Sequence, residues 1–362
     1  MCRVYRRAYA LLVGVAGGML LLALFTANAL GRSIVDPEGF LGPAWARGPL
    51  LILLALTLDM VPRALWYSKL DVRKMPGIVR ERWRTHWTRD RLVLVVLGLV
   101  CFYVTYVSYR NLKSFLPEVL GTDYMFDREL HQIDQLLFFG NEPAIVLHSI
   151  LGYEVVAQFL SLIYIWYLPL VPLAVTAWAI WSRNISFGYW FATSQVLAWT
   201  LGTASYYLLP TLGPGFEYSW LYTDLPQTPT TDLMQSLHYG RSTFLWNDVE
   251  NAIQGVAGFA SLHTAITLLW ALMAQYTVRN RVVHWIFWVN FGITIVATLY
   301  FGWHYVADDI GGIMIALISF YLGGLASGQK FDRMGRSSHP TTTTSRIPVD
   351  DRAAEGDPAA RA

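Results

Sequence analysis

Long apolar runs constrain this sequence more than any other feature. A bilayer core of roughly 30 Å needs about 20 apolar residues per spanning helix. Eight segments approach or exceed that length, at approximately 8–30, 49–67, 91–109, 155–181, 187–209, 257–278, 282–302 and 305–326. Charged residues make up only 14% of the chain, whereas soluble domains carry about 25%. The sequence therefore predicts an all-α integral membrane protein with about eight transmembrane helices, whose surroundings are the lipid bilayer.

The first apolar run could instead be a cleaved signal peptide. Arg3, Arg6 and Arg7 form a basic start, and residues 27–29 read Ala-Asn-Ala, which resembles a cleavage site. The apolar stretch is longer than the roughly 7–15 residues of a signal peptide. A retained helix is the favoured interpretation, and both interpretations give the same orientation downstream.

The distribution of Lys and Arg predicts the orientation, because cytoplasmic segments are enriched in them. The segment from Arg63 to Arg91, which joins the second and third runs, holds nine: Arg63, Lys69, Arg73, Lys74, Arg80, Arg82, Arg84, Arg89 and Arg91. The long connection 210–256 carries five acids and a single base, Arg241. We therefore expect both termini to be cytoplasmic and the connections 110–154 and 210–256 to lie outside.

The chain divides into three parts on this basis. Residues 1–90 form two helices and a basic cytoplasmic loop, 91–326 a six-helix catalytic membrane domain, and 327–362 a polar tail that we expect to be disordered. Within the outer connection, the stretch 127–140 has helical periodicity but is too short and too charged to span. It places Leu130, Ile133, Leu137 and Phe138 on one face, which predicts an interfacial helix lying on the bilayer.

Three ionisable residues at predicted helix ends form a candidate site. His263 lies near the start of the sixth run, and His304 and Asp308 lie where the seventh run turns into the eighth. His304 and Asp308 are four residues apart, so on a helix they share a face and can hydrogen-bond. A carboxylate on one imidazole nitrogen fixes the tautomer and raises the basicity of the other nitrogen. Ser261 and His263 lie at the first turn of the helix predicted for the sixth run, where free N–H groups and the helix dipole favour an anion.

These residues also have ordinary structural interpretations. A histidine near a membrane interface can be a hydrogen-bonded anchor, the His304–Asp308 spacing could be a structural ion pair, and Asp309 falls on a different face. A functional site is favoured because two histidines and a paired acid coincide at one depth, on one side, at adjoining helix ends. Cys2 and Cys101 give neither a disulfide framework nor a zinc motif.

At these positions the sequence resembles the type-2 phosphatidic acid phosphatase superfamily. That pattern has Ser-x-His at one helix start and His-x-x-x-Asp after a later helix, and here these are 261–263 (SLH) and 304–308 (HYVAD). The sequence is most similar to the inositol phosphorylceramide synthase-like branch, because SLH, the Thr-x-Tyr stretch at 298–300 and the segment 206–211 (YYLLPT) fit that branch. The resemblance covers roughly residues 91–326.

The resemblance implies a role for each residue. His304 is the nucleophile that forms a phosphohistidine, Asp308 orients it, and His263 protonates the leaving oxygen. Ser261 and nearby backbone N–H groups hold phosphate oxygens. The substrate is a phospholipid or another lipid-linked phosphate. No metal, other cofactor or nucleic acid is required, and no oligomeric state is specified.

The sequence departs from the hydrolase pattern at its phosphate-binding cations. Leu209 stands before Pro210 where that pattern has Arg, and Thr298 stands where it has another Arg. Outer-side substitutes are Arg110 and Lys113, which could equally be interfacial bases with extended side chains, and Arg241, which could be a structural ion pair.

The leading interpretation is a phosphotransferase that moves an inositol-phosphate-type headgroup to an acceptor hydroxyl. A lipid phosphatase, with water as the acceptor, is the alternative. A transporter proton relay or a metal-dependent membrane protein is a further alternative from a different class.

Overall fold

The computed structural model describes residues 6–37, 42–122, 125–246, 253–331 and 337–338, and the described part is almost entirely helical. The helices and strands have these bounds: α1 Arg6–Ala29, α2 Ala44–Ser68, α3 Met75–Thr85, α4 Arg89–Leu120, α5 Asp127–Leu137, α6 Pro143–Leu151, α7 Glu154–Trp181, α8 Ile185–Leu208, α9 Pro214–Glu217, η3 Ser219–Tyr222, α10 Pro229–Trp246, α11 Leu262–Thr277, α12 Arg281–Tyr300, α13 Val306–Ala326, β1 Lys330–Phe331 and β2 Ser337–Ser338. The all-α membrane fold is confirmed.

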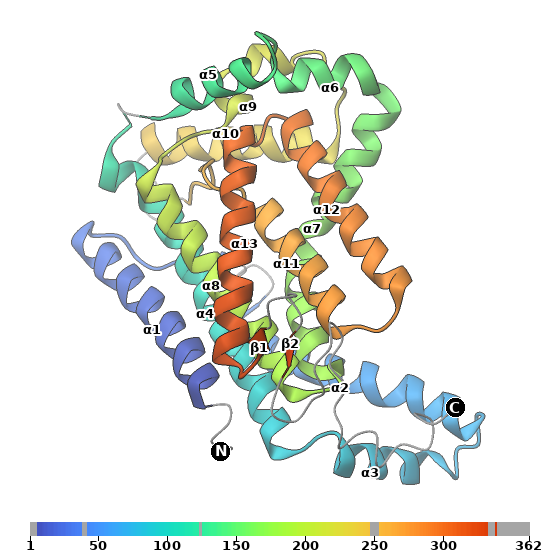
Figure 1. Ribbon diagram of the computed structural model, residues 1–362. Helices are drawn as coiled ribbons and strands as arrows, with labels where there is room; N and C mark the ends of the chain where they lie inside the picture. The colour runs from blue at the N-terminus through green and yellow to red at the C-terminus, as the bar shows by residue number, and fades with distance from the viewer. Residues whose placement is uncertain (1–5, 38–41, 123–124, 247–252, 332–336, 339–362) are drawn as a thin grey trace.

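Six of these helices are long and apolar enough to cross a membrane: α1, α2, α4, α7, α12 and α13. The other two predicted spans, α8 and α11, lie within the bundle (Figure 1) and are buried along almost their whole length. A helix enclosed by other helices needs no lipid-facing apolar surface, so α8 can carry residues such as Gln195 at full burial. The count of eight spans stays a prediction.

The outer surface of the bundle is apolar, as a bilayer requires. On α1, Leu21 and Phe25 are exposed, and on α12 and α13 Trp285, Ile310 and Met314 are exposed. Soluble proteins rarely expose large contiguous apolar surfaces of this kind to water. They therefore support the assignment of an integral membrane protein.

Two helices have bounds that differ from the prediction, and both differences affect the site. α4 was expected to end near residue 109 but continues to Leu120, so Arg110 and Lys113 lie within a helix. α11 was expected from residue 257 but begins at Leu262. The non-helical chain before it lies along α4, where the Gln254 amide donates to the Lys113 carbonyl oxygen at 2.7 Å.

Short helices cover one end of the bundle, where α5, α6, α9 and α10 lie (Figure 1). The helix expected over 127–140 is present as α5, with Leu130 buried while Ile133 and Leu137 are exposed. Ile133 and Leu137 thus point away from the protein, as in a helix that rests on a bilayer, whereas Leu130 packs against the protein. α2 and α3 lie toward the other end, where α1 begins (Figure 1).

The predicted disordered tail is described only in part. β1 pairs with β2 in antiparallel register, with Lys330 opposite Ser338. Residues 332–336 and 339–362 lie outside the described residues, as do 1–5 at the start of the chain.

Candidate active site

The turn between α12 and α13 presents His304 to the interior of the bundle. Gly302 has φ of 71°, a left-handed conformation that glycine adopts without strain. His304 follows at 7% exposure, and its Nδ1 lies 3.2 Å from Asp308 Oδ2. The same carboxylate oxygen accepts the Tyr305 N–H at 3.0 Å. Asp308 therefore caps the start of α13 and favours the tautomer in which His304 Nε2 carries the free lone pair.

His263 lies in the first turn of α11, between two aromatic rings. Its imidazole stacks on Tyr164 and Tyr167, with ring centroids 4.2 Å and 4.1 Å away. The centroids of His263 and His304 are 6.4 Å apart. His263 Nε2 is buried and has no hydrogen-bond partner among the described residues. The structure thus brings together two histidines that are 41 residues apart in the sequence.

Ser261 is the N-cap of α11. Its hydroxyl accepts the Thr264 N–H at 3.3 Å and donates to the Thr264 hydroxyl at 3.1 Å. Its backbone N–H donates to the Asp308 carbonyl oxygen at 2.9 Å. This junction needs Gly312 on α13, since a Cβ there would lie 2.4 Å from the Ser261 carbonyl oxygen. Ser261 therefore joins the two helix starts that carry the histidines and Asp308.

Lys113 is the predicted cation that lies deepest in the site. It is 9% exposed, and its ammonium lies over the rings of Tyr109 and Tyr206, at 5.8 Å and 5.2 Å. Its charge acts on both His263 and His304. Lys113 is therefore buried beside the histidines and is not a base extended into the interface.

Arg110 and Arg241 are half-buried and incompletely bonded. Arg110 lies one turn before Lys113 on α4 and packs beside Gly255, and its Nε has no hydrogen-bond partner in the described part of the chain. Arg241, on α10, has a buried Nη1 that no described residue bonds. Among the described residues, neither arginine nor Lys113 forms an ion pair with a carboxylate. Buried cations in this state favour an anionic ligand.

Two acids of α5 belong to the site although the sequence analysis did not select them. Asp127 accepts the N–H groups of Leu212 and Gly213 and the Tyr305 hydroxyl, at 2.9 Å, 2.9 Å and 3.0 Å. Asp134 accepts the Val306 N–H, the first of α13, at 3.1 Å. Burial raises the pKa of Asp134 to about 7, and nearby carboxylates add to this effect. Asp127 and Asp134 are seven residues apart and lie on the helix face that includes Leu130. This spacing is the sequence feature from which they could have been selected.

Asp309 holds three helices together. Its carboxylate accepts the Thr264 hydroxyl of α11 at 2.5 Å and the Thr298 hydroxyl of α12 at 3.1 Å. Thr298 is the position where the hydrolase pattern has Arg. Its side chain is fully buried, and its hydroxyl lies 2.7 Å from the Ile295 carbonyl oxygen and 3.1 Å from the Asp309 carboxylate, so this position supplies no cation to the site.

A small cavity reaches His304 from the covered end of the bundle. Its volume is about 10 Å³, and Asp134, Glu142, Tyr222 and Tyr305 also line it. This is about the space for one water molecule. Within the part of the chain that the structure describes, no group of three His, Cys, Asp or Glu side chains is arranged to hold a metal ion.

Comparison with known protein families agrees with this geometry. A family model described as PAP2 superfamily matches residues 128–322, more than half of the 362-residue chain. The chain belongs to the PAP2 superfamily. The matched segment contains His263, His304 and Asp308, whereas Arg110 and Lys113 lie before it. No curated protein and no solved structure matches the chain.

Membership confirms the superfamily predicted from the two histidine motifs. PAP2 superfamily proteins are phosphatases and phosphotransferases. The chain is thus assigned to membrane enzymes that act on lipid-linked phosphate. The inositol phosphorylceramide synthase-like branch, the acceptor and the role of each residue stay predictions.

Proposed function

We propose that the protein is a lipid phosphotransferase that moves a phosphoryl-headgroup, of inositol-phosphate type, to an acceptor hydroxyl through a phosphohistidine on His304. The observation that carries this proposal is the arrangement of His304, bonded to Asp308 at 3.2 Å, with His263 at 6.4 Å between ring centroids. One phosphoryl group can bridge a gap of this size with hydrogen bonds of about 2.8 Å. Lys113 supplies positive charge to the same gap.

In the first half-reaction, His304 Nε2 attacks phosphorus and the bond from phosphorus to the lipid oxygen breaks. His263, in its protonated form, gives its proton to that oxygen, so the lipid alcohol leaves neutral. Asp308 stabilises the positive charge that develops on His304. Lys113, with Arg110 and Arg241 on neighbouring elements, offsets the charge on the phosphate oxygens without a requirement for metal.

In the second half-reaction, the acceptor hydroxyl attacks phosphorus, the bond to His304 Nε2 breaks, and His263 takes the hydroxyl proton. His263 is thereby protonated again, and His304 returns to its starting state. Two features support transfer over hydrolysis: burial of the histidines limits access of bulk water, and Leu209 and Thr298 replace cations of the hydrolase pattern. The expected location is the extracytoplasmic face, since the nine bases of the segment from Arg63 to Arg91 gather toward the opposite end of the bundle.

Hydrolysis is the second candidate, and one observation favours it. The cavity beside His304 has about the volume of one water molecule and is lined by Asp134, a carboxyl group that could accept a proton. Water would then replace the acceptor hydroxyl in the second half-reaction, with the same phosphohistidine.

The test is to incubate the purified protein with labelled phosphoinositides and lipid phosphates, with and without acceptor lipids that carry a free hydroxyl. A labelled acceptor product indicates transfer, and free phosphate or inositol phosphate indicates hydrolysis. Both should survive a chelator and disappear in His304→Ala. Full turnover of His304→Ala on every lipid tested would remove the phosphohistidine mechanism.

A further inference from the structure

A second pocket lies far from the histidines, between the second half of α2 and the end of α7. Its volume is about 300 Å³ and it is open to the surroundings, a size at which small-ligand sites in proteins begin. Its position is fixed by Asp59, which bonds Trp87 just before α4 starts. Lys113 and the histidines lie near the other end of α4, roughly 35 Å away at about 1.5 Å per residue.

The single acid in the pocket is already neutralised. Asp59 is 3% exposed, and its two carboxylate oxygens accept from Arg82 at 2.9 Å and 3.0 Å. The Trp87 indole N–H donates to it at 2.9 Å. Because these donors occupy both oxygens, Asp59 contributes little net negative charge to the pocket.

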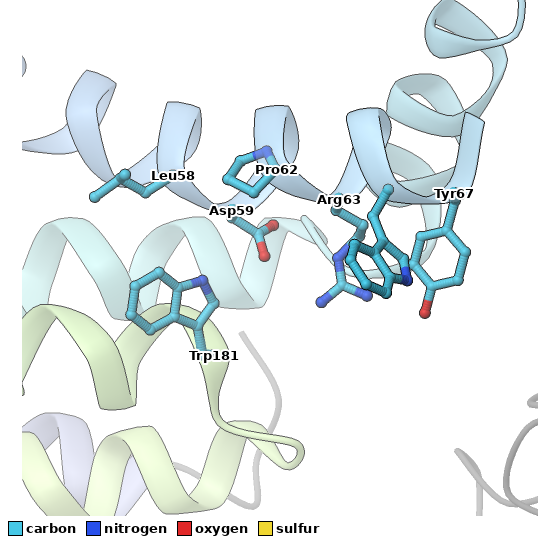
Figure 2. A pocket seen from close by; sticks show the side chains of 7 residues that line it. Leu58, Asp59, Pro62, Arg63, Tyr67 and Trp181 are labelled. Atoms are coloured by element: carbon cyan, nitrogen blue, oxygen red, sulfur yellow. The ribbon is translucent and has the colours of Figure 1, made fainter. Parts of the chain in front are cut away.

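The second charged residue that lines the pocket is Arg63. Figure 2 shows Asp59, Arg63 and Tyr67 projecting from the same side of α2 toward the pocket. The Arg63 Nε is buried and has no acceptor among the described residues. No carboxylate in the described ranges pairs with its guanidinium. A guanidinium in this state presents a fork of donors that matches a phosphate.

The walls of the pocket are aromatic and continue into lipid-facing surface. Trp66 is 80% exposed, and Trp181, from the end of α7, is 48% exposed. Indole and phenol rings favour the depth of the lipid headgroups. Leu58, in the pocket wall, and Leu65, close by on α2, are exposed as well. A ligand with a charged head and apolar chains fits this combination, because its chains can remain in the bilayer.

We propose that this pocket binds the phosphate of an anionic phospholipid from the leaflet at this end of the bundle. An anionic headgroup is favoured over a zwitterionic one, because a choline group would face Arg63 and the excess of bases in this segment. Such clusters of Lys and Arg beside a transmembrane helix attract anionic lipids. The proposal is independent of the chemistry at His304.

The experiment uses the full-length protein in a neutral detergent, titrated with phosphatidylglycerol or with phosphatidylcholine of the same acyl chains. Native mass spectrometry counts the lipids retained. We expect one phosphatidylglycerol to bind at least about fivefold more tightly than phosphatidylcholine, the effect of one basic group near an anionic headgroup. Arg63→Gln should abolish this preference and Arg63→Lys should keep most of it.

The matched control is Arg84→Gln, which removes the same charge from an exposed position on α3 outside the pocket. It should retain the preference, and thermal unfolding of each variant checks the fold. Equal loss in Arg63→Gln and Arg84→Gln would show a diffuse basic surface and overturn the pocket. Equal binding of both lipids would overturn headgroup recognition, and displacement by equimolar inorganic phosphate would show that the site takes free phosphate instead of lipid.

Discussion

Replacement of Asp308 by Asn tests the central pair of the site most directly. The carboxylate oxygen lies 3.2 Å from His304 Nδ1, and a charge pair at that distance is worth roughly 5 kcal/mol at an effective dielectric constant of about 20. The Asn amide dipole restores part of this interaction. We therefore expect a loss of about 4 kcal/mol in transition-state stabilisation, which is about 1000-fold in kcat.

The fold should survive this substitution. Asp308 Oδ2 accepts the hydrogen bonds from His304 Nδ1 and the Tyr305 N–H, whereas Oδ1 is buried and has no partner among the residues that the structure describes. The Asn carbonyl oxygen can take the place of Oδ2, and its NH₂ group replaces Oδ1 at a cost of about 1–3 kcal/mol in stability. The assay is single-turnover transfer of labelled headgroup, with thermal unfolding as a check.

The matched control is Asp309→Asn, which removes a neighbouring buried carboxylate that is bonded to Thr264 and Thr298. It should cost less than about tenfold in kcat, although its charge also acts on His304. If Asp309→Asn costs as much as Asp308→Asn while both proteins remain folded, the assignment of Asp308 as the partner of His304 is wrong.

Three further predictions follow from the geometry. Lys113→Met should lower kcat/KM by about 100-fold, the effect of one lost charge-assisted contact in a buried site, measured by steady-state kinetics. Because the folded-state pKa of Asp134 is raised to about 7 from 3.8, the stability contributed by its protonated form is present below about pH 4 and is lost as pH rises from about 4 to 7. The Tm of Asp134→Asn relative to the native protein should therefore rise over that range and stay level above it. In a background without native cysteines, an impermeant maleimide should label Asn141→Cys in intact cells and Arg73→Cys only after permeabilisation.

The histidine site could be predicted because its signals are local. The spacing of His304 and Asp308 specifies their contact wherever α13 begins, and the structure has that contact at 3.2 Å. The approach of His263 depends on tertiary packing, and the topology of alternating spans was enough to place it on the same side. The deep position of Lys113 could not be predicted, because charged residues normally end an apolar span, whereas here α4 continues to Leu120 and buries Lys113.

The acids of α5 were missed for a different physical reason. The apolar periodicity of this segment identifies the face that meets the bilayer, with residues such as Ile133 and Leu137, and it says nothing of what the opposite face contacts. At a membrane surface the apolar face meets lipid, and the polar face can meet the protein. Asp127 and Asp134 occupy that polar face and bind backbone N–H groups at the start of α13 and in the 212–213 segment.

The acids around the histidines are hydrogen-bonded within the protein and the cations are less so, which suits an anionic substrate. Each acid is bonded within the protein: Asp127 to two backbone N–H groups and a hydroxyl, and Asp309 to two threonines. The cations are less fully bonded: within the described ranges, Lys113 has one side-chain hydrogen bond, of 3.5 Å to a tyrosine hydroxyl, and Arg110 and Arg241 each keep an unbonded donor. Cations buried without partners cost stability, and such costs are typical of functional sites. A bound phosphate analogue such as vanadate should therefore raise Tm, and it should do so less in Lys113→Met; an equal rise in both proteins would place the anion elsewhere.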